Sequence, residues 1–240
     1  LNCVYCGLFL FLGLCVDIIG GNEVAPHSRP FMVLINNANG EFICGGALIK
    51  KNWVLTAAHS HSRKENEREK QVIRIAKQFR YPRYRSNVKE NDIMLLQLKK
   101  RARLNKAVQL IPLPTSDYDP KPGTTCTVAG WGQTRNYLRK PSDTLREVNI
   151  TVISRQICND KHHYKNNPVI TDNMICAGAK NGGKDSCSGD SGGPLRCNNV
   201  MRGITAFGKA NKCGTADGPG VYTRLTKQYL QWIRKTIGGA

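Results

Sequence analysis

Residues 185–194 read Asp-Ser-Cys-Ser-Gly-Asp-Ser-Gly-Gly-Pro, and this stretch says more about the fold and chemistry of the chain than any other. A serine between glycines can sit on a tight turn whose backbone N–H groups face a ligand. Such N–H groups can hold the oxyanion of an acyl-transfer transition state. Taken alone, the stretch is also compatible with an ordinary glycine-rich turn.

Two further motifs carry residues that could act with Ser191. Residues 55–59, Leu-Thr-Ala-Ala-His, place His59 after an apolar run, where an imidazole can serve as a general base near neutral pH. Residues 91–96, Asn-Asp-Ile-Met-Leu-Leu, place Asp92 before an apolar run, where its carboxylate could orient an imidazole or simply cap a strand. The chain order His59, Asp92, Ser191 is that of the chymotrypsin type of triad, not that of subtilisin or the α/β-hydrolases.

Short runs rich in Val, Ile and Phe, separated by Gly, Pro, Asn or Asp, predict an all-β sandwich or barrel. Pro114–Pro122 contains three prolines and is typical of a linker between two halves. Apolar residues recur every four positions near the C-terminus and predict a helix over Lys227–Ile237. The predicted strands are 31–35, 42–49, 53–57, 72–79, 93–98, 125–129, 148–153, 174–177, 194–197, 203–207 and 220–225.

The cysteines and the N-terminal segment both predict export. The ten cysteines are scattered, without histidines at zinc-site spacing, which favours disulfides in an oxidising compartment and no metal or cofactor. Residues 4–16 are apolar throughout, too short to span a bilayer comfortably but suited to the core of a signal peptide. We therefore expect residues 1–15 to be the remnant of a signal peptide on a secreted protein, with a buried strand as the alternative.

The charge of the chain is strongly basic, with 36 Lys+Arg against 17 Asp+Glu. The densest run is Lys99–Lys106, and no acidic residue lies between Asp92 and Asp117. Such a surface attracts polyanions. We expect sulfated proteoglycans as partners, together with acidic or nucleic-acid-associated protein substrates; a basic surface that serves only solubility is the alternative.

Taken together, Ile18–Gly21, Thr56–His59 and residues 185–194 resemble the signatures of the chymotrypsin-fold, trypsin-like serine proteases. The resemblance runs from Ile18 to the end of the chain. Ile18–Pro30, Ser142–Thr151 and Asn211–Gly214 are further similar to the granzymes, of the A type with the K type as the nearest alternative. This resemblance implies two six-stranded antiparallel Greek-key barrels and a C-terminal helix, with residues 18–118 in the first barrel and 119–240 in the second barrel and helix.

The resemblance also implies what the motif residues do. Ser191 would be the nucleophile, His59 its general base and Asp92 the residue that orients the imidazole, while the N–H groups of Gly189 and Ser191 would form the oxyanion hole. Asp185 would lie at the floor of the substrate pocket and select Arg or Lys. The remaining substrate-binding positions would be Ala206, Phe207, Gly208 and Gly220. As in granzymes, the enzyme would act from the secretory granules of cytotoxic lymphocytes.

Activation and covalent modifications follow from the same resemblance. Removal of the dipeptide Val16-Asp17 would free the α-ammonium group of Ile18 to pair with Asp190. Asn149, in Asn149-Ile150-Thr151, would accept a glycan. The implied disulfides are Cys126–Cys197, Cys158–Cys176 and Cys187–Cys213.

Four departures from the family pattern stand out. Ser60 replaces the cysteine that would bond Cys44, so Cys44 should be unpaired. Residues 59–71 contain no apolar side chain and are about a dozen residues short, roughly one strand and its turn. The first barrel should therefore lack a strand, because a segment is lost or because the barrel closes differently.

Two single-residue departures remain. Ala206 replaces a serine that would contact the triad aspartate. Arg83 replaces the cysteine of a disulfide-linked dimer, which we therefore do not expect. A catalytically impaired homologue that acts by binding polyanions is the alternative to an active enzyme.

Overall fold

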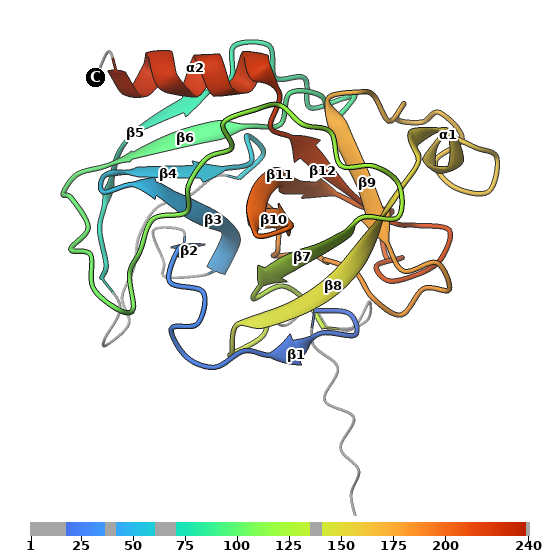
Figure 1. Cartoon of the computed structure of the whole chain (residues 1–240), viewed down its shortest axis with the longest axis horizontal. Helices are drawn as coiled ribbons and strands as arrows, with labels where there is room; N and C mark the ends of the chain where they lie inside the picture. The colour runs from blue at the N-terminus through green and yellow to red at the C-terminus, as the bar shows by residue number, and fades with distance from the viewer. Residues whose placement is uncertain (1–17, 37–41, 61–70, 135–140, 239–240) are drawn as a thin grey trace, which may run out of the picture.

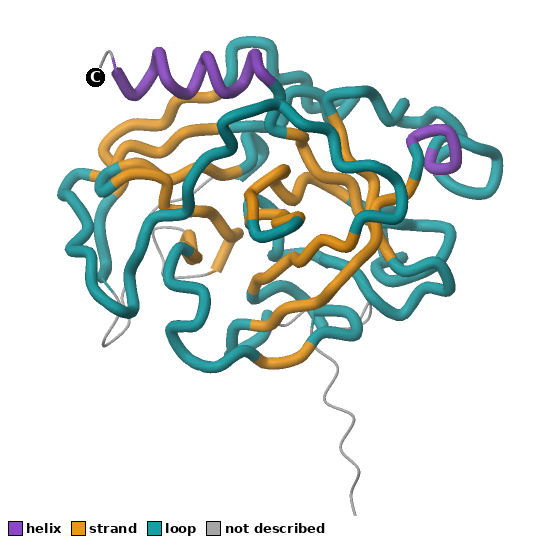
Figure 2. Tube along the Cα trace, viewed as in Figure 1, coloured by secondary structure: helices purple, strands orange, loops and turns teal. Residues whose placement is uncertain are grey.

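The computed structural model describes residues 18–36, 42–60, 71–134 and 141–238 (Figure 1). The predicted signal segment 1–15 and activation dipeptide Val16-Asp17 lie outside these residues, as do positions 61–70 of the interval without apolar side chains. Strands and loops dominate the described residues, which contain two helical segments (Figure 2). Neither of these two helices has the length and apolar character needed to cross a bilayer.

The second half of the chain forms a closed antiparallel barrel. Its strands are β7 Thr125–Gly130, β8 Arg146–Ile153, β9 Met174–Gly178, β10 Pro194–Cys197, β11 Val200–Phe207 and β12 Gly220–Arg224. They run in the order β8-β7-β10-β11-β12-β9, and β9 pairs back onto β8. Residues of β8 are alternately buried and more exposed, as expected for a strand with one face on the barrel core. The barrel predicted for this half is confirmed.

The first half forms a sheet of five strands, β2 Met32–Asn36, β3 Phe42–Lys50, β4 Trp53–Thr56, β5 Ile75–Arg80 and β6 Met94–Leu98. They run in the order β2-β3-β4-β6-β5. Within the described residues β2 and β5 are therefore edges, and the sheet does not close. Across the ranges that the structure describes, the first half thus has five sheet strands where a complete barrel has six, in agreement with the prediction.

Each end of the described chain packs on the opposite half of the molecule. The short strand β1, Asn22–Glu23, pairs with β8 of the second barrel. The C-terminal helix α2, Lys227–Gly238, lies along β5 and β6 of the first sheet (Figure 1). Its Tyr229 and Ile233 are buried in one core with Trp53 and Leu55 of β4. The two halves are thus held together by both termini as well as by the linker between them.

Three disulfides brace the second half, and they are the three that the resemblance implied. Cys126–Cys197 joins β7 to β10, Cys158–Cys176 joins the short helix α1, Arg155–Cys158, to β9, and Cys187–Cys213 joins two loops. Cys44 of β3 is buried and unpaired, as expected from the serine at position 60.

Candidate active site

The two residues predicted to act as base and orienting acid are brought together by the pairing of β4 with β6. Thr56, the last residue of β4, lies opposite Met94, the first of β6. His59 follows β4 and Asp92 precedes β6, so the two reach the same edge of the sheet. Nδ1 of His59 lies 2.6 Å from Oδ2 of Asp92, and the His59 backbone N–H donates to Oδ1 at 3.0 Å. This geometry holds Nδ1 toward the carboxylate and leaves Nε2 for another partner.

Asp92 is almost fully buried while His59 remains partly open, with side-chain exposures of 2% and 35%. The second barrel holds the Asp92 backbone, since the Thr223 hydroxyl donates to its carbonyl at 3.0 Å. Ala206, where the family would place a serine, is buried and has no hydroxyl to offer. The carboxylate nevertheless accepts from His59 at both oxygens.

The turn that carries Ser191 packs against the strands that lead to His59. The N–H of Gly45 in β3 donates to the Ser191 carbonyl at 2.8 Å. Gly192 has φ of +83°, and a Cβ there would overlap the Thr56 hydroxyl and the Gly45 carbonyl. Only glycine allows so close an approach. Because Thr56 precedes His59 by three residues, the structure sets the Ser191 turn beside the histidine segment.

The turn also leaves backbone donors available. Gly189 has φ of +102°, and a Cβ there would press on Gly132 and the ring of Phe42. The amide N–H groups of Gly189 and Ser191 donate to no acceptor within the described ranges. Two free N–H groups on one tight turn are the arrangement expected of an oxyanion hole.

Asp185 is a buried carboxylate at the base of the neighbouring loops. Its oxygens accept the N–H groups of Ser186 at 2.8 Å and Gly214 at 3.0 Å, and its exposure is 1%. Burial raises the pKa of Asp185 to about 7, and the nearby charge of Asp190 adds to this effect. A Cβ at Gly220 would press on the Asp185 carboxylate, whereas one at Gly208 would meet open space. Gly220 therefore borders this carboxylate, and Gly208 faces open space.

The remaining predicted pocket residue, Phe207, ends β11 beside Gly208. Its ring packs edge-on against Tyr164, with centroids 6.0 Å apart. Lys209 extends over the same Tyr164 ring, and its ammonium group pairs with Asp217 at 3.2 Å. The sequence did not predict that Tyr164, Lys209 and Asp217 lie beside Phe207. They come together only through the folding of separate loops, and no local sequence pattern marks such residues.

Ile18 and Asp190 are both fully buried, and Ile18 packs in the core of the second barrel. The Asp190 carboxylate accepts the N–H groups of Gly132 and Cys187, each at 2.8 Å. Burial raises its pKa to about 7 despite these hydrogen bonds. Sequence reasoning missed Ile19, whose carbonyl accepts the Asp185 N–H at 3.0 Å and thereby links the segment after Ile18 to the Asp185 loop.

Two other predicted positions lie on the surface. Asn149 is exposed on β8, and its Oδ1 accepts the Thr127 hydroxyl at 2.9 Å, so its side chain is accessible beside β7. Arg83 is exposed in the loop after β5. No cluster of His, Cys, Asp and Glu suited to a metal ion occurs in the described part of the chain.

Comparison with known proteins places this chain in a family. The Trypsin family model matches residues 18–233. Granzyme A from Bos taurus is 51% identical, covering 94% of this chain and 90% of that protein. Kallikrein 1-related peptidase b11 from Mus musculus is 39% identical, covering 92% of this chain and 89% of that protein. Kallikrein-14 from Homo sapiens is 38% identical, covering 92% of this chain and 84% of that protein. The chain therefore belongs to the trypsin family of serine endopeptidases, as a member similar to granzyme A.

Proposed function

We propose that this endopeptidase cuts after Arg or Lys, with Ser191 as nucleophile, His59 as general base and Asp92 as the residue that orients the imidazole. His59 would take the Ser191 hydroxyl proton through Nε2 and return it to the leaving amine. The N–H groups of Gly189 and Ser191 would hold the oxyanion, and loss of one such donor typically costs about 2.7–4 kcal/mol of transition-state stabilisation.

The observation that supports this specificity best is the carboxylate of Asp185, buried between the Ser186 and Gly214 N–H groups and bordered by Gly220. A carboxylate at the floor of a desolvated pocket favours a guanidinium or ammonium group and penalises apolar side chains left facing it. Gly208 and Gly220 leave room for a long side chain, with Ala206 and Phe207 completing the wall.

The test uses the chain that begins at Ile18 and measures hydrolysis of peptide amides or thioesters that differ only in the residue before the cut. Arg and Lys substrates should be cleaved, and the isosteric but uncharged citrulline substrate should not. Ser191→Ala should abolish the signal, and Asp185→Asn should abolish the preference for the cation. No hydrolysis above the Ser191→Ala background would instead favour a catalytically impaired, polyanion-binding homologue. The five-stranded first sheet of the described residues is the observation that supports this alternative.

Activation would depend on the α-ammonium group of Ile18 pairing with Asp190 after removal of Val16-Asp17. A buried carboxylate without a counter-charge is unfavourable, and Ile19 contacts both Asp185 and Gly214. A chain with any residue before Ile18 should therefore be inactive. Full activity of such an extended chain would refute this mechanism.

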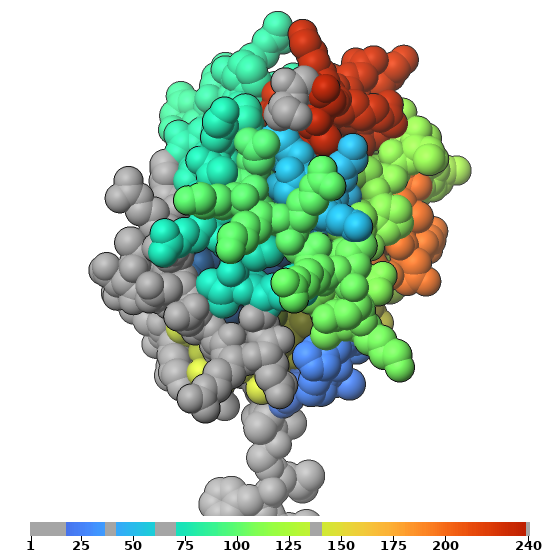
Figure 3. Space-filling view, turned by 90° about the vertical axis from the view of Figure 1, so that its left-hand side faces the viewer, coloured from blue at the N-terminus to red at the C-terminus, as the bar shows by residue number. Residues whose placement is uncertain are grey.

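The basic surface supports a role in granules that store cationic proteases on sulfated proteoglycans. Lys99, Lys100, Arg101, Arg103 and Lys106 are all exposed. Backbone hydrogen bonds from Lys99 to Arg74 and from Ala102 to Lys51 draw further basic residues to the same surface. Figure 3 shows residues near 100 (light green) and residues 71–90 (teal) side by side on this face. The described ranges 42–60, 71–89 and 93–116 contain no acidic residue.

Binding to heparin-like sulfated glycans should fall steeply with salt, because each neutralised anion releases counter-ions. Replacing Lys99, Lys100 and Arg101 by Gln should weaken this binding. The control makes the same change in charge elsewhere on the surface, by replacing Lys227, Arg234 and Lys235 of α2. Equal loss in both variants would mean that net charge alone attracts the glycan. The same surface would retain acidic or nucleic-acid-associated substrates. With Arg83 in place of the family's cysteine, a dimer linked by a disulfide at this position is not expected.

A further inference from the structure

The hydroxyl of Tyr229 in α2 contacts the residue that directly precedes Asp92. Tyr229 has no exposed surface, and its Oη donates to Oδ1 of Asn91 at 2.7 Å. A buried tyrosine hydroxyl normally requires a partner. Here the last helix of the chain supplies the hydroxyl and the loop before β6 supplies the acceptor, across most of the length of the sequence.

Asn91 is held in an unusual backbone conformation by contacts at both ends of its side chain. Its φ is +58°, in the left-handed region that L-residues other than Asn and Gly rarely adopt. While Oδ1 accepts from Tyr229, Nδ2 donates to the Arg83 carbonyl at 2.8 Å. The Asn91 carbonyl accepts the N–H of Ile93 at 2.9 Å, which closes a tight turn around Asp92.

Asp92 is therefore fixed from both sides by the second half of the chain. Thr223 of β12 holds its carbonyl directly, and Tyr229 holds the residue before it. We propose that Tyr229 is a positioning residue for the reaction, which acts through Asn91 to aim the Asp92 carboxylate at His59. This proposal rests on the role proposed above for Asp92. Tyr229 touches neither substrate nor the reacting atoms.

The aim of the Asp92 carboxylate matters because it selects the His59 tautomer and steadies the imidazolium that forms during the reaction. Small displacements of catalytic groups reduce the rate steeply, whereas substrate binding at Asp185 is made by other loops. One neutral hydrogen bond of ordinary strength predicts a loss of about 3- to 10-fold in kcat for Tyr229→Phe, with KM within about 2-fold.

The matched control is Tyr81→Phe. Tyr81 packs edge-on against Tyr229, with ring centroids 5.0 Å apart, so this variant removes a hydroxyl from the same aromatic cluster. Activity is expressed per active site, titrated with a covalent serine reagent, so that partial unfolding does not lower the apparent kcat. We expect Tyr81→Phe to match the parent. Equal kcat for the parent and Tyr229→Phe would overturn the proposal.

A double-variant cycle separates positioning from general stability. Asn91→Gly retains access to positive φ but removes the acceptor of the Tyr229 hydroxyl. Because Tyr229 is proposed to act only through Asn91, Tyr229→Phe should cause no further loss of kcat in the Asn91→Gly background. The same loss in both backgrounds would show that Tyr229 does not act through Asn91.

A measurement without turnover keeps the proposal testable even if the parent enzyme proves inactive. In the Ser191→Ala chain beginning at Ile18, the proton on Nδ1 of His59 reports its hydrogen bond to Asp92 by NMR. Tyr229→Phe should shift this resonance, and Tyr81→Phe should not. An unchanged resonance in Tyr229→Phe would refute the inference, whereas absence of hydrolysis by the parent would refute only the proposed function.

Discussion

Asp185 and Asp190 are both buried carboxyl groups whose pKa is raised to about 7. Desolvation is the main cause for each, because a charged carboxylate is poorly stabilised where water is excluded. Each would meet a cation in the proposed mechanism, Asp185 that of the substrate and Asp190 that of the Ile18 terminus. The two groups are thus poised to ionise when their partners arrive.

Binding of a cationic inhibitor should therefore depend on pH through Asp185. In the Ser191→Ala chain beginning at Ile18, the affinity for an arylamidine should increase as pH rises from 5 through about 7 and then level off, because Asp185 must lose its proton to pair with the amidinium. Calorimetry across this range measures the effect. Asp185→Asn should bind weakly at every pH, and a pH-independent affinity of the parent would contradict the prediction.

The unpaired thiol of Cys44 lies close to Ser60, the position where the family has a cysteine. The Cys44 thiol is buried beside the hydroxyls of Ser60 and Thr56, and burial raises its pKa to about 11, so the thiol is protonated and inert. Ser60→Cys should form a disulfide with Cys44 and stabilise the protein by about 3 kcal/mol, the value expected for a closed loop of this size. Thiol titration and denaturant unfolding test this. Ser60→Ala is the control, and two free thiols in the oxidised Ser60→Cys protein would count against it.

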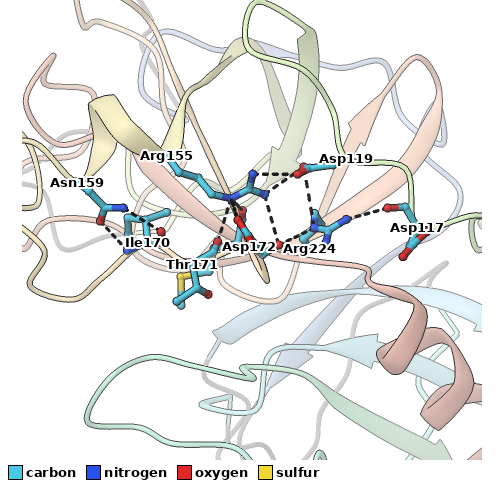
Figure 4. Close-up of polar contacts among 9 residues, drawn as sticks. Asp117, Asp119, Arg155, Asn159, Ile170, Thr171, Asp172 and Arg224 are labelled. Carbon is cyan, nitrogen blue, oxygen red and sulfur yellow. Dashed lines mark hydrogen bonds and ion pairs between the residues drawn. The ribbon is translucent and has the colours of Figure 1, made fainter.

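At the scale of elements, the linker between the halves is anchored on the second barrel by two arginines (Figure 4). Arg155 of α1 donates to both oxygens of Asp119, at 2.9 and 3.1 Å, and to the carbonyls of Thr171 and Met174. Arg224 of β12 donates to the carbonyls of Asp117 and Asp172, each at 2.7 Å. The linker is therefore a fixed part of the second barrel surface.

Removing this anchor should destabilise the fold. Arg155→Met keeps the aliphatic stem but removes hydrogen bonds to a carboxylate and three carbonyls, and we expect a loss of about 2–3 kcal/mol in the free energy of unfolding. Denaturant unfolding is the measurement. Arg234→Met on the exposed face of α2 should change stability by less than about 0.5 kcal/mol. If both variants unfold alike, the anchor contributes nothing.

At the scale of the whole molecule, the activation segment, pocket and first sheet are linked by contacts that cross the two halves. Ile19 touches the Asp185 and Gly214 segments, Gly45 touches Ser191, and Tyr229 touches Asn91. In the proposed mechanism, a change at the N-terminus of Ile18 would reach the Asp185 loop through these contacts of Ile19.

The chain extended before Ile18 should become less stable as pH rises. The pKa of Asp190 in the folded protein, about 7, exceeds the value of about 3.9 of an unperturbed aspartate, so the folded state binds the proton more tightly. Its stabilising contribution is complete below about pH 4 and is lost between about pH 4 and 7. The chain beginning at Ile18, in which an ammonium group can pair with Asp190, should lose less stability over this pH range. Thermal unfolding of both Ser191→Ala forms across this range tests the difference, and identical pH profiles would contradict it.

Local patterns alone sufficed for much of this molecule. The strand at 42–49, the helix at 227–237 and the glycine-flanked turn at Ser191 each follow from residues close together in the chain, because side-chain period and turn geometry are short-range properties. Strand β1 and helix α1 were not predicted. The former spans two residues and exists only through its pairing with β8, and the latter is a single turn capped by Ser154.

The sequence by itself determined the order of the candidate triad and, through its resemblance to a known family, the trypsin-like fold, the unpaired Cys44 and the five-stranded first sheet of the described residues. Only the tertiary structure decided that α2 covers the first sheet, that Ile19 reaches the Asp185 loop and that Tyr229 holds Asn91. These contacts join segments far apart in the chain, and their energy comes from burial and hydrogen bonding between surfaces that exist only once both halves have folded.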